Sequence, residues 1–117
     1  MGLPPSPAAP ARIRETGWTL MPVIGGMLDA LVRTLAVNFA PIRVNGVVPG
    51  PVMTELWGGG QKLPEAKAKA IAQDYSGKLL TGAIGTPENL AEAYIYLMKD
   101  RYITGQMTLS DGGSLLK

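Results

Sequence analysis

Residues 41–54, PIRVNGVVPGPVMT, carry the stretch that decides the fold. The first part is mostly apolar and rich in β-branched residues, which is typical of a parallel strand covered on both faces. The Pro-Gly-Pro at 49–51 then ends the strand, because proline cannot donate to a ladder and glycine allows unusual dihedrals. Ligands of open α/β sheets bind just beyond the carboxyl ends of strands, which is where residues 52–54 stand. A buried strand and a tight turn without a ligand explain the same pattern.

The segments on both sides of this strand predict an α/β fold with two parallel strands and three main helices. Apolar residues in 24–40 recur at steps of three and four, and Pro41 ends that helix. The apolar stripe is wide, which predicts burial on more than one side. Thr86 as N-cap and Pro87 in the first turn start another helix. The expected strands are residues 43–48 and 106–110, and the expected helices are residues 24–40, 64–75 and 87–99.

The last predicted helix carries apolar side chains on one face. The residues expected to be buried there are Leu90, Ala93, Tyr94 and Leu97. Tyr94 and Tyr96 are interpreted as packing residues rather than acids. The β-α-β order implies a right-handed crossover, and a sheet of two strands leaves an edge that another segment or chain must cover.

The composition fits a soluble globular protein, with 46% hydrophobic and 17% charged residues. The chain has no cysteine and no histidine, which excludes thiolate chemistry and removes the commonest metal ligand, so no metal site is predicted. A net charge of +2 without a basic run gives no indication of nucleic-acid binding. No apolar run approaches the ~18 residues of a membrane span, and the expected location is the cytoplasm.

The chain is expected to have two parts. Residues 1–16 are rich in proline and alanine and predict an irregular arm, because such a segment suits neither a central strand nor a regular helix. Residues 17–117 are expected to form the folded segment.

Several motifs resemble the short-chain dehydrogenase/reductase family. The Arg-Val-Asn at 43–45 and the Pro-Gly-x-x-x-Thr at 49–54 are similar to the residues before and after the family's sixth strand. The segments IGTPENLAEAYIYLM and YITGQMTLSDGG resemble its last helix and last strand. The resemblance covers roughly residues 17–116 and corresponds to the C-terminal part of a usual member. It implies a partial Rossmann-like, doubly wound unit.

The same resemblance implies half of a dinucleotide site. Thr54 matches the threonine that contacts the cofactor, NADP or NAD, near the nicotinamide and phosphates. The backbone of Val52 would face the nicotinamide amide, and Pro49 and Gly50 would shape that wall. Residues 51–82 correspond to the mobile substrate lid, or form a simple connection. The lid residues expected to face a small-molecule substrate are Leu56 and Trp57, with Tyr75 as the one spare phenol.

The residues that would complete the family's chemistry are missing. The Tyr-x-x-x-Lys positions fall on Met21 and Gly25, and the serine position falls on Ala8, although Ser6 is nearby. No catalytic residue is therefore assigned. The sequence also lacks the strand–glycine turn–helix unit that grips pyrophosphate, so cofactor affinity of this chain alone is expected to collapse.

Two kinds of function follow from the resemblance. The chain is expected to be a truncated, atypical member whose ancestral role is NAD(P)(H)-dependent oxidoreduction of a carbonyl or imine, and to be inactive in that role alone. The alternatives are a non-catalytic oligomerisation or interaction module, and a non-redox cyclase or isomerase. A homo-oligomer is expected, with Leu28, Leu31 and Val32 as contact residues.

Overall fold

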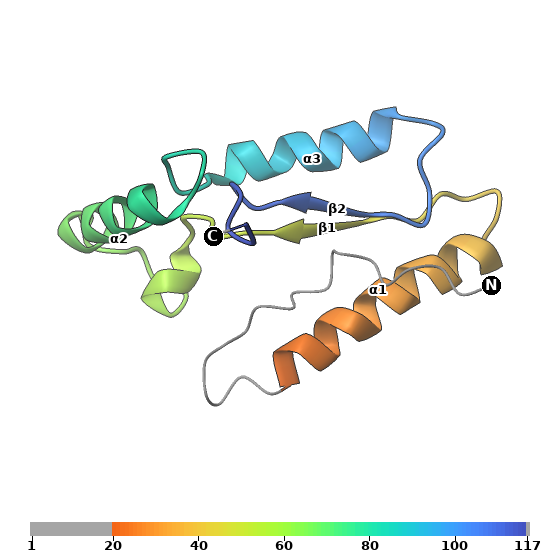
Figure 1. Cartoon of the computed structure of the whole chain (residues 1–117), viewed down its shortest axis with the longest axis horizontal. Coiled ribbons are helices and arrows are strands. Elements are labelled where there is room, and N and C mark those ends of the chain that lie inside the picture. Colours follow the sequence, from red (N-terminus) through yellow and green to blue (C-terminus); the bar gives the residue numbers. More distant parts are fainter. Residues whose placement is uncertain (1–19, 117) are drawn as a thin grey trace. The chain divides into compact units, whose positions relative to one another are not determined.

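The computed structural model describes residues 20–116, and the arm predicted at 1–16 lies outside them. Two strands and three α-helices make up the described chain, with one short 3-10 helix, η1 (Figure 1). They are α1 (Leu20–Asn38), β1 (Gly46–Pro49), η1 (Glu55–Gly58), α2 (Glu65–Lys78), α3 (Pro87–Lys99) and β2 (Met107–Ser110). The predicted α/β class with two parallel strands and three main helices is confirmed.

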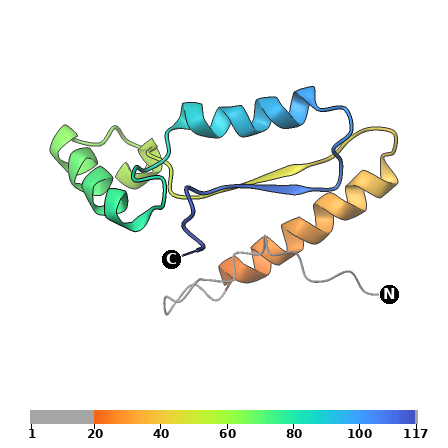
Figure 2. The ribbon, with the colours of Figure 1, turned by 45° about the horizontal axis from the view of Figure 1, so that its top comes forward.

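β1 and β2 form a two-stranded sheet, and both views show them side by side (Figures 1 and 2). Both strands are shorter than the predicted 43–48 and 106–110. Ahead of β1 the chain still bonds to its neighbour, because the Gly105 N–H donates to the Val44 carbonyl at 2.7 Å. This pairing of the two segments therefore begins before the regular strands do.

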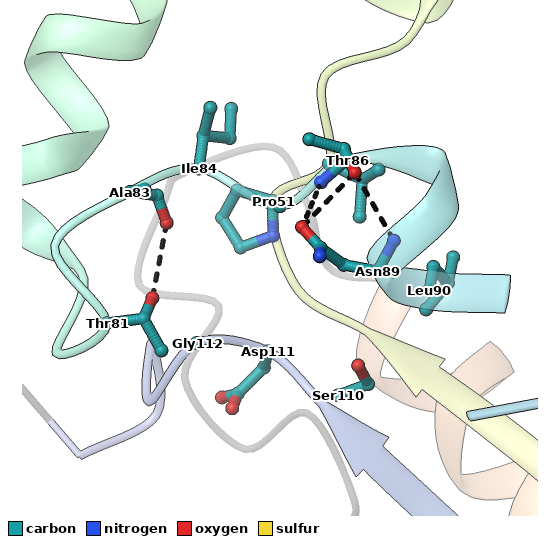
Figure 3. Close-up of a pocket in the computed structure, with 12 residues that line it drawn as sticks. Pro51, Thr81, Ala83, Ile84, Thr86, Asn89, Leu90, Ser110, Asp111 and Gly112 are labelled. Carbon is teal, nitrogen blue, oxygen red and sulfur yellow. Dashed lines mark hydrogen bonds between the residues drawn. The ribbon is translucent and has the colours of Figure 1, made fainter. Parts of the chain in front are cut away.

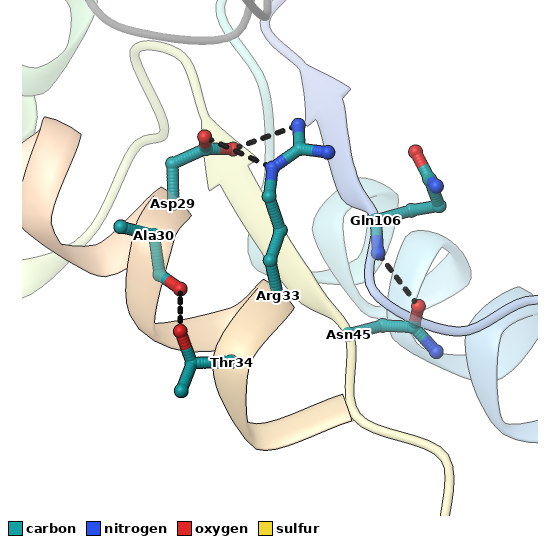
Figure 4. Close-up of polar contacts among 6 residues, drawn as sticks. All are labelled: Asp29, Ala30, Arg33, Thr34, Asn45 and Gln106. Atoms are coloured by element: carbon teal, nitrogen blue, oxygen red, sulfur yellow. Dashed lines mark hydrogen bonds and ion pairs between the residues drawn. The ribbon is translucent and has the colours of Figure 1, made fainter. Parts of the chain in front are cut away.

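The chain divides into two compact units, Met1–Val48 with Asp100–Thr108 and Pro49–Lys99 with Leu109–Lys117. In the first unit, Asn45 clamps the turn that precedes β2. Its Nδ2 donates to the Ile103 carbonyl at 3.0 Å. Its Oδ1 accepts from the Gln106 N–H at 3.2 Å (Figure 4). The Arg43 guanidinium also donates to the Ile103 carbonyl, at 3.2 Å. The Arg-Val-Asn motif therefore has a structural role in fixing strand register.

α1 begins at Leu20, earlier than predicted, since Pro22 is tolerated in a first turn. Asp29 and Arg33 pair at 3.2 Å one turn apart along the helix (Figure 4). The prediction of burial on more than one side was wrong for this chain. Large apolar side chains of α1 are 42–72% exposed at Leu20, Val23, Ile24, Met27, Leu28 and Leu31. One face of α1 thus lacks a covering layer among the described residues.

The second unit contains η1, α2 and α3. α3 has the predicted bounds, and Thr86 caps it reciprocally with Asn89. The Asn89 N–H donates to Thr86 Oγ1 at 3.2 Å, and the Thr86 N–H donates to Asn89 Oδ1 at 3.0 Å. α2 extends to Lys78, three residues beyond the prediction, with an Asp74–Lys78 ion pair in its last turn. Among the described residues, Leu79 and Leu97 are the buried hydrophobic side chains, with 4% and 7% exposed.

Within residues 20–116, no helix is both long enough and apolar enough to cross a membrane. No group of three or more potential metal-ligating side chains occurs in that part of the chain.

Candidate functional site

The turn after β1 brings the backbone of Gly50 against that of Asp111. The Gly50 N–H donates to the Ser110 carbonyl at 2.9 Å. A Cβ added to Gly50 would lie 2.4 Å from Asp111 Cα and 2.7 Å from the Asp111 carbonyl oxygen. Such distances are closer than real Cβ atoms approach backbone, so the position requires glycine.

A parallel bridge to Gly85 then orients Val52. The Gly85 N–H donates to the Pro51 carbonyl at 3.1 Å, and the Met53 N–H donates to the Gly85 carbonyl at 2.8 Å. Because the flanking residues make these bonds, the N–H and carbonyl of Val52 lie outside the bridge. The Val52 carbonyl accepts a hydrogen bond from Trp57 Nε1 at 2.8 Å.

Thr54 lies directly before η1, and Trp57 lies within it. Thr54 is the N-cap residue, but its side chain makes no capping hydrogen bond, so its hydroxyl is available to a ligand. The Trp57 ring meets the Tyr75 ring of α2 edge-on, with centroids 5.4 Å apart and planes at 68°. Trp57 therefore connects the turn after β1 to α2 through one hydrogen bond and one ring contact.

These residues surround a cavity of about 500 Å³, which we call the Trp57 cavity. Its lining consists of Pro49, Gly50, Pro51, Val52, Thr54, Leu56, Trp57, Pro87, Leu90, Ala91 and Tyr94. The structure thus brings together all four residues predicted for the cofactor wall and two of the three predicted for the lid. The third, Tyr75, does not line the cavity and instead contacts the Trp57 ring.

The wall that α3 contributes to this cavity was missed from the sequence. Tyr94 was expected to be buried, but it is 49% exposed and lines the Trp57 cavity. Tyr96 was also expected to pack, and it is 50% exposed. The spacing of Pro87, Ala91 and Tyr94 places them on one helical face, but it does not say what that face meets.

Comparison with known proteins identifies the family. A family model described as enoyl-(acyl carrier protein) reductase matches residues 9–114. A short-chain dehydrogenase/reductase of Stachybotrys chlorohalonatus, ATR9, is 46% identical over 101 residues, which is 86% of this chain and 38% of that protein. The chain belongs to the short-chain dehydrogenase/reductase family.

Solved structures of this family have the same fold over most of the chain. A small-chain dehydrogenase in complex with NADPH matches with a TM-score of 0.75 and 31% identity, over 86% of this chain and 44% of that one. The MalC reductase/Diels-Alderase of Malbranchea aurantiaca matches with a TM-score of 0.76 and 38% identity, over 89% of this chain and 39% of that one. The chain therefore spans less than half the length of these relatives.

A smaller cavity of about 290 Å³ in the same unit has more polar walls (Figure 3). Asp111 lines it, and its carboxylate accepts hydrogen bonds from the Gly113 N–H, the Ser114 hydroxyl and the Leu115 N–H at 2.9–3.1 Å. Partial burial opposes ionisation of Asp111, but the three hydrogen bonds outweigh it and lower the pKa of the carboxyl. We interpret Asp111 as a structural residue that closes the turn after β2.

By the resemblance, the positions of the family's catalytic tyrosine and its lysine both fall on α1. Met21 and Gly25 stand one turn apart, which preserves the spacing without the functional groups. Ala8 and Ser6 lie outside the described residues. No proton donor is therefore assigned.

Proposed function

We propose that this chain supplies the nicotinamide-side wall and the substrate lid of an NAD(P)H-dependent oxidoreductase acting on a carbonyl or imine, and does not perform that reaction alone. The observation that carries the proposal is the convergence of Pro49, Gly50, Val52 and Thr54 with the predicted lid residues on one cavity. The proposed location is the cytoplasm.

The residues present fit one end of the cofactor. The Val52 N–H, left outside the Gly85 bridge, can donate to a carboxamide, and the Thr54 hydroxyl can contact a phosphate or ribose oxygen. The bound cofactor would supply hydride to the substrate. Among residues 20–116, however, no glycine turn links a strand to a helix N-terminus, so the pyrophosphate end has no cradle.

The second requirement of reduction is a proton for the developing alkoxide or amine. A positioned acid typically contributes ~10²–10⁴-fold. The family's positions for that acid and its supporting lysine hold Met21 and Gly25, neither of which can donate a proton. The described residues at the Trp57 cavity can bind and orient a substrate and exclude water, but the two family positions on α1 supply no acid.

The proposal is tested by following NADPH oxidation with simple ketones. The purified chain is expected to give no turnover above the buffer control. Steady turnover that Thr54→Ala abolishes would contradict the proposal, because a complete site would then exist. The matched control is Thr34→Ala, since Thr34 lies on α1 and bonds only within that helix, to the Ala30 carbonyl at 2.9 Å.

A second candidate function is supported by the exposed face of α1. Ile24, Met27, Leu28 and Leu31 follow helical spacing and are 42–59% exposed. An apolar stripe of this kind indicates an interface, and we propose that a second copy of the chain covers it. The chain would then act as an oligomerisation module without chemistry of its own. Non-redox cyclisation is a third candidate, favoured by the reductase/Diels-Alderase among the similar structures.

A further inference from the structure

The side chains that line the Trp57 cavity indicate the kind of ligand it would bind. Every residue that lines it is uncharged, and most of the lining is proline, glycine or aliphatic. Its volume of about 500 Å³ falls in the range of small-molecule sites. We propose that the cavity binds an uncharged, planar aromatic ring system. The inference rests on the proposed function, which makes this cavity the substrate side, and it adds the class of substrate.

The absence of charge from the lining favours a neutral ligand. A charged group moved into this cavity would lose its hydration, and the lining offers no opposite charge in return. The charged side chains nearby line a different hollow of about 680 Å³, which includes Glu55 and Lys62. A carboxylate or an ammonium on the ligand is therefore disfavoured in the Trp57 cavity.

Two aromatic side chains from different elements favour a flat ligand. Trp57 comes from η1 and Tyr94 from α3, and both line the cavity. The indole orientation is fixed, because Nε1 donates to the Val52 carbonyl at 2.8 Å and the ring meets Tyr75. A ring held in place before binding loses little conformational entropy on contact. Aromatic contacts contribute to binding beyond the area that they bury.

The polar groups on the lining suit one neutral oxygen. Tyr94 contributes a phenol to the lining, whereas the Thr54 hydroxyl is proposed to face the cofactor. Hydroxyls can donate to a ketone or accept from a phenol, so they orient a neutral ligand without requiring charge. A planar ring with one such oxygen matches the cavity.

The test compares two ligands that share a ring. In a Trp18→Phe background, Trp57 is the one tryptophan, and its fluorescence reports binding of 2-acetylnaphthalene or of 2-naphthoate. The neutral ketone is expected to bind at least about tenfold more tightly, which corresponds to 1.4 kcal/mol. Equal or tighter binding of the carboxylate would overturn the proposal.

Two variants locate the ligand. Tyr94→Ala should weaken binding of the ketone by about five- to tenfold, through loss of an aromatic contact and its buried area. Tyr96→Ala is the matched control, since Tyr96 has the same exposure on the same helix but does not line the cavity. Equal losses in both variants would overturn the assignment. Ala91→Asp places a carboxylate in the lining at an exposed helical position and should abolish binding.

The result is separable from the proposed function. If the chain turns over NADPH but discriminates the two ligands as expected, the proposed inactivity is wrong and the substrate class stands. If no turnover occurs and neither ligand binds, with circular dichroism unchanged, the substrate class is wrong and the proposed inactivity stands.

Discussion

Replacement of Gly50 by alanine tests how closely the ends of β1 and β2 approach. The added Cβ would lie 2.4 Å from Asp111 Cα, whereas ordinary contact begins at 3.4 Å, so the two segments must separate by about 1 Å. The Gly50–Ser110 hydrogen bond, now 2.9 Å, would then exceed the 3.5 Å limit for such a bond. Backbone atoms cannot rotate away as a flexible side chain can.

The magnitude follows from three effects. Overpacking costs about 1–3 kcal/mol, and loss of one hydrogen bond costs about 1 kcal/mol. Alanine offsets about 0.4–1 kcal/mol of this destabilisation, because it reduces the conformational entropy of the unfolded chain. We expect Gly50→Ala to lower the free energy of unfolding by about 1–3.5 kcal/mol, measured by urea denaturation with circular dichroism.

Gly26→Ala is the matched control for this measurement. Gly26 lies inside α1, and a Cβ there would have nothing within 4 Å. Alanine is the better helix former, so this variant should stabilise the chain by about 0.5–1 kcal/mol. If Gly50→Ala unfolds within about 0.5 kcal/mol of the parent, the size usual for a neutral surface change, the close approach at Asp111 is wrong.

Three further predictions concern the cap of α3, the turn after β2 and association. Thr86→Ala should cost about 1 kcal/mol of unfolding free energy in urea, because the Asn89 N–H loses its cap; an unchanged midpoint would argue against the capping pair. Hydrogen bonding lowers the pKa of Asp111, so its contribution to stability is present above the ordinary value of 3.8 and is lost as the pH falls through the folded-state pKa. Asp111→Asn should flatten that acid dependence in thermal melts, and an unaltered profile would contradict the assigned cause. In sedimentation, Leu28→Lys should dissociate the proposed oligomer, whereas Val37→Lys, 77% exposed and away from the stripe, should not; a monomeric parent at high concentration would refute the interface.

Much of the fold was predictable because local signals agreed with each other. The start of α3 follows from Thr86 and Pro87, whose capping chemistry needs no tertiary contact. The start of α1 was misplaced because the predicted helix was begun where the apolar period begins, at residue 24, although Pro22 is tolerated in a first turn. η1 was not predicted, since a short 3-10 helix has no apolar period.

Only the part of the candidate site that lies on one continuous stretch of sequence was predictable. Residues 49–57 follow one another in sequence, so a turn after a strand could gather them. The contribution of Tyr94 depends on how α3 stands against that turn, which no local pattern specifies. The hydrogen bond from Trp57 to the Val52 carbonyl is likewise a matter of three-dimensional approach.

The central proposal is that residues 20–116 carry the nicotinamide half of a cofactor site without the phosphate half. NMR titration of the labelled chain with reduced nicotinamide mononucleotide and with NADPH tests it directly. We expect both to bind weakly, within about threefold of each other, a difference of only ~0.7 kcal/mol, because the adenosine end gains no contacts. The shifted amides should cluster at Gly50, Val52 and Thr54. NADPH binding more than about a hundredfold tighter than the mononucleotide, worth ~2.7 kcal/mol, would contradict the claim.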